Sequence, residues 1–396
     1  MPKPLEGIVV LDLTRVLSGP YCTMQLADMG AEVLKIEMPG RGDDTRHFGP
    51  PFRNGESAYF LSINRNKKSI TLNLKSEKGK AILRRLIPQA DILVENFRPG
   101  TLDNLGFGYE TLSTLNPRLI YCAISGFGHT GPDRLRPGYD LVVQGEGGVM
   151  SLTGEPDGPP YKVGVSFADI VAGMVAVQGI LLALLAREKS GKGQKVDISM
   201  LDCQVSLLTY QAGIYFFTGQ SPFRMGNLHP TLAPYETFKC QDEYINVAVG
   251  NDSLWARFCQ VIDLPHLQND ARFVTNEERV KNHAALKEIL DRVFAQKTRQ
   301  EWLTLLQEAG IPCGAIKTVA EVCNDPQVLA REMVVEIEHP TVGKTKVPGV
   351  PVKLSDTPGG VETPPPLLGE HTEEVLSRML GLQADEIAAL REEKVI

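Results

Sequence analysis

The aspartate at position 169 stands where a carboxylate could serve as a nucleophile. It belongs to the stretch VGVSFADIVAGM and directly precedes a run, residues 170–186, without a charged side chain. Ser166 and Asp169 fit the S-x-x-D pattern of a helix start, so the sequence predicts that Ser166 caps a helix and Asp169 lies at its positive end. A purely structural cap is the simplest interpretation. The two roles are compatible, because a carboxylate at a helix N-terminus stays ionised and can act as a nucleophile.

The motifs of several enzyme classes are missing from the chain. No GxGxxG follows the first predicted strand and no GxxxxGK[ST] occurs, which argues against nicotinamide-dependent oxidoreductases and NTPases. The GxSxG elbow of a serine hydrolase is absent. No HExxH and no paired His/Cys cluster occurs either, so we expect no metal.

The composition is ordinary for a soluble globular protein. Of the 396 residues, 42% are hydrophobic and 22% are charged, and the net charge of −7 argues against binding to nucleic acid or to an anionic membrane. Seven cysteines without metal-like spacing indicate reduced thiols and therefore a cytoplasmic protein. The uncharged run 170–186 could barely span a bilayer, and Gly173, Gln178 and Gly179 occur within it, so we expect a buried helix.

Strands and helices alternate through the first half of the sequence, which predicts an α/β domain with a mostly parallel sheet and ligand-binding loops beyond the carboxyl ends of its strands. A hairpin at 235–250 and the helices that follow predict a smaller α+β domain. The expected division is a large domain at 1–205, a linker at 206–224, a small domain at 225–325, and a segment at 326–396 that returns to the large domain. The strands are expected at 7–15, 31–37, 69–75, 91–97 and 119–127, and the helices at 20–29 and 76–89.

Eight stretches in this order resemble the class III CoA-transferases, the group of formyl-CoA transferase and carnitine CoA-transferase. Their amino-acid sequences are most similar to those of the branch that includes succinyl-CoA:glutarate CoA-transferase. The stretches are LDLTRVLSGP, GAEVLKIEMPGRGDDTR, NRNKKSITLNLK, VENFRPG, YDLVVQGEGG, FADIVAGM, GKGQKVDISMLD and PPLLGEHT.

The resemblance implies a Rossmann-like large domain and a ring-shaped subunit in an interlocked homodimer. It also implies that Asp169 is the nucleophile and that CoA moves from an acyl-CoA, here succinyl-CoA, to a carboxylic acid, here a dicarboxylate. CoA would be carried as an aspartyl-CoA thioester, so coenzyme A enters as a substrate and no metal is required. The residues that the resemblance assigns to CoA are Val16, Leu17, Leu72, Asn73, Leu74, Lys75, Asn96, Phe97, Arg98, Pro137, Gly138, Tyr139 and Asp140.

Some of these residues have simpler interpretations. Taken alone, Lys75 and Arg98 are most simply solvated surface charges. For the second carboxylate of a dicarboxylate, the candidate anchors are Arg46, which could instead pair with Asp43 or Asp44, and Arg224 and His229. The loop GQSPFRMGN, with Gly226 as its mobile point, would replace the glycine run that closes over the intermediate in formyl-CoA transferases.

The chain also departs from formyl-CoA transferases at Leu17, Met38 and Asn104, where they have Gln, Arg and Arg. These differences put formyl-CoA and oxalate as substrates in doubt. One alternative is a 2-methylacyl-CoA racemase, although Tyr139 stands where racemases have a histidine and His129 is the nearest imidazole in the sequence. A catalytically inactive acyl-CoA-binding protein is the other alternative.

Overall fold

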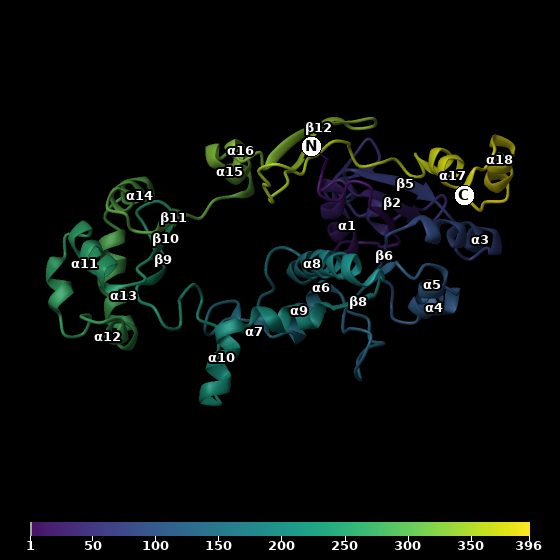
Figure 1. Cartoon of the computed structure of the whole chain (residues 1–396). Coiled ribbons are helices and arrows are strands. Elements are labelled where there is room, and N and C mark those ends of the chain that lie inside the picture. The colour runs from purple at the N-terminus through teal and green to yellow at the C-terminus, as the bar shows by residue number, and fades with distance from the viewer. Residues whose placement is uncertain (1) are drawn as a thin grey trace. The chain divides into compact units, whose positions relative to one another are not determined.

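The structure of this chain is a computed structural model that describes residues 2–396 (Figure 1). These residues form two compact units. The first unit comprises residues 2–150, 162–220 and 326–396, and the second comprises residues 151–161 and 221–325. The domain boundaries expected from the sequence stay a prediction.

A six-stranded sheet lies at the centre of the first unit, and all its neighbouring strands are parallel. The predicted α/β class with a mostly parallel sheet is thereby confirmed. The strands at 9–12, 92–95 and 120–125 are mainly apolar, as expected where both faces of a sheet are covered, whereas those at 32–37, 67–71 and 195–199 each contain lysine. In spatial order they are β5 (Lys67–Thr71), β2 (Glu32–Glu37), β1 (Val9–Asp12), β6 (Ile92–Glu95), β7 (Ile120–Ser125) and β8 (Lys195–Ser199).

The order of these strands reverses between β1 and β6. Counted along the chain, the sheet strands run third, second, first, fourth, fifth and sixth across the sheet. In such sheets the loops beyond the carboxyl ends of the two central strands diverge and leave a crevice for a ligand. The loops concerned are residues 13–17 after β1 and residues 96–100 after β6.

Two helices cover one face of the sheet and lie side by side, α1 (Ser18–Asp28) and α8 (Phe167–Ser190) (Figure 1). Their close approach depends on Gly173, because a Cβ atom there would lie 2.7 Å from the carbonyl oxygen of Ser18. Helix α1 starts earlier than the predicted residue 20. The close packing therefore brings the first turns of both helices to the same end of the sheet.

Helix α8, which was expected to be buried, is buried along one face and exposed along the other. Ala168, Ala172 and Ala176 pack against the sheet, whereas Leu182 and Leu185 are 66% and 64% exposed. Among residues 2–396 it is the one helix that is long and apolar enough to cross a membrane. Its exposed apolar face calls for a covering surface.

The C-terminal residues return to the first unit and pack beside β5. Thr372 accepts a hydrogen bond from the Thr71 N–H, and Glu374 bonds Lys68. The segment 326–396 also contains a hairpin of β12 (Val334–His339) and β13 (Gly343–Pro348). Strand β5 also starts and ends earlier than the predicted 69–75, because Leu72 already belongs to the loop beyond it.

The second unit contains the predicted hairpin, which is confirmed as β9 (Tyr235–Lys239) and β10 (Tyr244–Ala248). Strand β11 (Cys313–Ala315) pairs with β10, and helices pack an aromatic core against this small sheet. Its helices are α11 (Asp252–Val261), α12 (Asn276–Lys281), α13 (His283–Phe294), α14 (Arg299–Glu308) and α15 (Val319–Cys323).

The remaining elements are short or peripheral. They are β3 (Phe52–Arg53), β4 (Glu56–Ser57), α2 (Ala58–Ile63), α3 (Glu77–Leu86), α4 (Thr101–Leu105), α5 (Tyr109–Leu115), α6 (Asp140–Glu146), α7 (Val149–Leu152), α9 (Met200–Leu207), α10 (Thr209–Thr218), α16 (Pro326–Ala330), α17 (Thr372–Leu380) and α18 (Ala384–Glu392).

Candidate active site

Asp169 lies in the first turn of α8, three residues after Ser166, as the S-x-x-D pattern predicts. The predicted cap is nevertheless wrong, because the Ser166 side chain makes no capping hydrogen bond to the helix. Instead, the Ala168 N–H donates to Oδ1 of Asp140 over 2.9 Å. A carboxylate from α6, 28 residues earlier in the chain, therefore caps α8.

Asp169 is more readily protonated than an ordinary, solvent-exposed aspartate. Burial raises the pKa of this carboxyl from 3.8 to about 7, and the negative charge of Asp140 adds to the rise. A hydrogen bond from the Ser18 hydroxyl opposes the rise. The expectation that the helix start keeps Asp169 fully ionised at neutral pH is therefore wrong, because burial outweighs the helix end. A carboxylate with this pKa is a better nucleophile once it is ionised.

Tyr59 is a residue of this site that the sequence analysis missed. It lies on α2, whose first turn is capped by Ser57, and its hydroxyl is close enough to the Ser166 side chain for that group to oppose the rise of its pKa. Burial raises the pKa of Tyr59 to about 12, and the nearby carboxylates of Asp169 and Asp140 add to the rise. The phenol thus stays a donor beside Asp169. No motif or spacing announces it, because α2 follows a short hairpin far from α8 in sequence.

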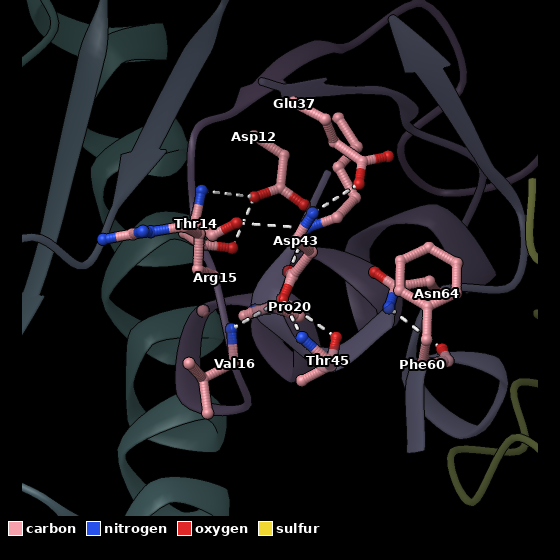
Figure 2. A network of polar contacts seen from close by, with 12 residues as sticks. Asp12, Thr14, Arg15, Val16, Pro20, Glu37, Asp43, Thr45, Phe60 and Asn64 are labelled. Carbon is pink, nitrogen blue, oxygen red and sulfur yellow. Dashed lines mark hydrogen bonds and ion pairs between the residues drawn. The ribbon is translucent and has the colours of Figure 1, made fainter. Parts of the chain in front are cut away.

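Side chains form hydrogen bonds to the backbone of residues 14, 15 and 16 in the loop after β1 (Figure 2). Asp12 accepts from the Thr14 N–H, and Asn96 both accepts from the Arg15 N–H and donates to the Arg15 carbonyl. Asp43 accepts from the Val16 N–H. The loop therefore enters α1 with a fixed backbone, and Ser18 at the first position of that helix reaches Asp169.

A cavity of about 510 Å³ opens at the crevice between the loops after β1 and β6. Its apolar lining includes Leu13, Met38, Leu72, Leu74, Phe97 and Leu105. Arg15, Arg41 and Lys75 add positive charge to it, and the Arg15 guanidinium lies over the Phe97 ring at 5.2 Å. The cavity can therefore hold a ligand that combines an apolar or aromatic part with anionic groups.

Comparison with known proteins identifies the chemistry of this arrangement. The profile of the family described as CoA-transferase family III matches residues 5–372. The chain belongs to CoA-transferase family III. As a family III CoA-transferase it is an enzyme that moves CoA between an acyl-CoA and a carboxylic acid.

Individual relatives can be aligned over most of this chain. It is 44% identical over 378 residues to succinyl-CoA:glutarate CoA-transferase of Mus musculus. The alignment covers 96% of this chain and 87% of the relative. It is 46% identical over 356 residues to acetyl-CoA:oxalate CoA-transferase of Acetobacter aceti, covering 89% and 90% of the two chains. The crystal structure of a CAIB/BAIF family protein from Brucella suis superposes with a TM-score of 0.85 at 43% identity, over 96% of this chain and 100% of that one.

Part of the residue set assigned to CoA comes together at the cavity. Leu72, Leu74, Lys75 and Phe97 line it, and so do Met38 and Asn104, where this transferase departs from formyl-CoA transferases. Arg15 and Arg41 also line the cavity and were not predicted. Arginines in the loops after β1 and β2 were the only available signal for them.

The other assigned residues do not line this cavity. Asn96 and Val16 shape the loop before α1, Leu17 is buried there, and Asn73 bonds the C-terminal Val395 carbonyl through its N–H. Arg98 is exposed. The loop from Pro137 to Tyr139 precedes α6, and it touches the end of β7 where Gly126 and Gly138 leave room for backbone against backbone.

The candidate substrate anchors are distributed over both units. In the first unit Arg46 donates from Nε and Nη2 to Glu37 rather than pairing with Asp43 or Asp44, and its side chain is only 8% exposed. This pairing argues against an anchoring role for Arg46. In the second unit, Arg224 donates to the carbonyls of Glu155 and Gly158.

The other two candidates also belong to the second unit. Gly226 has a φ of +58° and donates its N–H to the Gly154 carbonyl. His229 lines a small cavity with Tyr235 and His283. Their roles toward substrate stay predictions. Among residues 2–396 no group of three or more His, Cys, Asp or Glu residues could hold a metal ion.

Proposed function

We propose that this enzyme is a cytoplasmic transferase in which Asp169 is the nucleophile and an aspartyl-CoA thioester carries CoA between two acids. The observation that carries the proposal is the raised pKa of a carboxyl at the start of α8, beside the hydroxyl of Ser18. A carboxylate that is neither paired with a cation nor needed as a cap has few structural reasons to occupy such a place. Attack on a thioester is a reason that fits it.

The reaction follows from carboxylate chemistry. An oxygen of Asp169 attacks the thioester carbonyl carbon of the donor, the C–S bond breaks, and CoA thiolate leaves a mixed anhydride. The thiolate then attacks Cγ of Asp169, which forms the aspartyl-CoA thioester and releases the donor acid with one former Asp169 oxygen. The acceptor carboxylate repeats these steps in reverse and restores Asp169. No proton is gained or lost, so the protein must mainly position the reactants and exclude water.

The cavity at the β1/β6 crevice supports a place for the nucleotide part of CoA. Its apolar walls suit an adenine ring, and Arg15, Arg41 and Lys75 suit the phosphates. The thirteen residues assigned to CoA from the resemblance would continue the path past Asn96 and Tyr139 to Asp169. We therefore propose acyl-CoA as the bound substrate, without a metal.

Succinyl-CoA as donor and a dicarboxylate as acceptor are the substrates that we propose. Relatives are named for glutarate in the mouse and for oxalate in Acetobacter aceti, and both acids are dicarboxylates. One carboxylate must react, so the other is available as an anchor for a positive group. Because Arg46 is paired with Glu37, Arg224 and His229 are the remaining candidates.

An acceptor screen with succinyl-CoA tests the substrate proposal. We expect the highest kcat/KM among C2 to C6 dicarboxylates, and a loss of about tenfold or more for monomethyl glutarate, which keeps the reacting carboxylate but lacks the anchor charge. A monoacid such as carnitine as the best acceptor would contradict the dicarboxylate proposal. Exchange of the α-hydrogen of a 2-methylacyl-CoA with deuterated solvent, without CoA transfer, would instead favour a racemase.

An interlocked homodimer is the assembly that we propose. Helix α10 has no buried residue, and Phe216 and Phe217 are 77% and 95% exposed. Exposed aromatic side chains grouped on one helix mark an interaction site, and the exposed Leu182 and Leu185 of α8 are further apolar residues that a partner could cover. Sedimentation equilibrium should give twice the chain mass, and Phe216→Asp/Phe217→Asp should weaken the dimer. A monomeric wild-type enzyme with full activity would contradict this assembly.

A further inference from the structure

A buried ion pair lies directly beneath the loop that leads into α1. The side chains of Lys35 on β2 and Asp43 are both 0% exposed, and Lys35 Nζ lies 2.8 Å from Asp43 Oδ2. Burying two charges is costly, and such pairs add little stability compared with apolar residues of the same volume. The pair therefore needs an explanation other than stability.

Val16 in this loop has a backbone conformation that valine rarely adopts. Its φ is +68°, in the left-handed region where the branched side chain crowds the backbone. Strained residues of this kind persist only where the surroundings over-determine them, and they cluster at active sites. Something must hold Val16 in place.

Asp43 and Lys35 hold both sides of this strained turn. Asp43 Oδ1 accepts from the Val16 N–H over 3.2 Å, while Oδ2 accepts from Lys35 (Figure 2). Lys35 also donates to the Thr14 carbonyl over 3.0 Å. Asp43 is itself fixed, because Thr45 donates to Oδ1 from its N–H and its hydroxyl.

The turn at Val16 determines where α1 begins. Leu17 and Ser18 follow it directly, and the Ser18 hydroxyl lies close enough to Asp169 to lower the pKa of its carboxyl. Val16 and Leu17 also pack in one apolar cluster with Tyr59. A change of φ at Val16 would swing the first turn of α1 away from the carboxylate.

We propose that Asp43, held by Lys35, is a positioning residue for CoA transfer: it keeps Val16 left-handed and thereby sets Ser18 against Asp169. The inference rests on the proposed role of Asp169 as nucleophile. Asp43 touches neither the reacting atoms nor Asp169. Its effect on the reaction is transmitted through the backbone of residues 16–18.

A double-mutant cycle between Asp43→Asn and Val16→Gly tests the positioning role. Glycine adopts a positive φ without a steric penalty, so it should not need Asp43 to hold the turn. We expect Asp43→Asn to lower kcat/KM by about 10- to 100-fold in the wild-type background but by less than about threefold in the Val16→Gly background. Equal losses in the two backgrounds would overturn the proposal, because a merely structural role of the ion pair does not depend on residue 16.

Asp28→Asn is the matched control. It breaks the buried pair of Asp28 and Arg65, whose side chains are each 2% exposed and lie 2.7 Å apart, without touching residues 13–18. We expect it to lower the Tm, to leave kcat/KM within about twofold of wild type, and to show no coupling to Val16→Gly. A coupling as large as that of Asp43 would contradict the specific link between Asp43 and Val16.

A second pair of substitutions covers the case in which Asp43→Asn does not fold. Lys35→Met/Asp43→Leu replaces the ion pair by apolar side chains, an exchange that often retains stability. We expect Val16→Gly to reduce the loss of kcat/KM in this variant as well. If Asp43→Asn and Lys35→Met/Asp43→Leu were both insoluble, with Val16 and with Gly at position 16, the ion pair would serve folding and the proposal would be overturned. If the Asp169→Asn variant still transferred CoA, the proposed role of Asp169 as nucleophile would be refuted. The coupling between Asp43 and Val16 could still be measured in the overall rate of CoA transfer, so the two failures are distinguishable.

Discussion

Helices α3 and α8 of the first unit both have a serine at the N-cap position, yet their first turns are built differently. At the start of α3, the Ser76 hydroxyl accepts from the Gly79 N–H over 3.0 Å, which is the ordinary local cap. At the start of α8, Ser166 makes no such bond, and Asp140 from another helix accepts from the Ala168 N–H. The first arrangement closes a helix, whereas the second leaves polar groups available around Asp169.

The difference separates a structural helix start from a functional one. Because Asp140 takes over the cap, the Ser166 hydroxyl can bond Tyr59, and Asp169 can remain uncommitted to the α8 backbone. The same exchange brings a second negative charge close to Asp169 and raises its pKa. The comparison therefore predicts large effects on activity at α8 and effects on stability alone at α3.

The largest effect is expected for Asp169→Asn. Loss of the nucleophile should lower the rate of CoA transfer by about 10³-fold or more, while the protein stays folded. Since the folded-state pKa of about 7 lies above the usual 3.8, ionisation of Asp169 destabilises the fold increasingly between pH 4 and pH 7. The variant should thus be more stable than wild type at pH 8, by up to about 4 kcal/mol, and not at pH 4. Thermal melts at both pH values measure this.

Asp140→Asn should change the pH dependence. In wild type, kcat/KM should rise with pH through about 7 as Asp169 ionises. Asparagine can still accept from the Ala168 N–H but removes the negative charge, so the acidic limb should move to lower pH. A limb that stays in place would show that Asp140 does not act on Asp169 electrostatically.

Ser76→Ala, at the start of α3, should lower the stability of the fold and leave the activity unchanged. Removing the cap of α3 should cost about 1 kcal/mol in the free energy of unfolding, measured by urea denaturation. Its kcat/KM should stay within about twofold of wild type, because Ser76 contacts nothing around Asp169. A loss of activity similar to that of Asp140→Asn would erase the distinction between the two helix starts.

Ser166→Ala should give the smallest change in stability. Without a capping bond to lose, the substitution should cost less than about 0.5 kcal/mol, clearly less than Ser76→Ala under identical denaturation conditions. Its expected consequence is a modest fall in kcat as Tyr59 loses its partner. A cost equal to that of Ser76→Ala would mean that Ser166 caps α8 after all.

Local patterns predicted the positions at this site but not its long-range contacts. The S-x-x-D pattern placed Ser166 and Asp169 correctly at the start of α8, whereas the actual cap, Asp140, comes from a separate helix. Likewise, Arg46 was a candidate anchor that could instead pair with Asp43 or Asp44, and the structure pairs it with Glu37 of β2. Such partners depend on how strands are placed in space, which adjacent residues do not encode.

Buried charges and short hairpins were the least predictable features of the fold. Lys35 and Lys67 are fully buried in strands, and no hydrophobic pattern announces a lysine inside a sheet. The β12–β13 hairpin lies in the segment 326–396, for which the sequence predicted no strand. The parallel sheet itself was predictable, because strand and helix patterns alternate through the first half of the sequence.

Trapping the covalent intermediate tests the central claim most directly. The enzyme is incubated with succinyl-CoA without acceptor and then quenched with hydroxylamine, and its peptides are analysed by mass spectrometry. An aspartyl-CoA thioester should give a hydroxamate at Asp169 alone, and neither Asp169→Asn nor enzyme without succinyl-CoA should give any. Efficient CoA transfer with unmodified Asp169, or with the hydroxamate on another residue, would contradict the account.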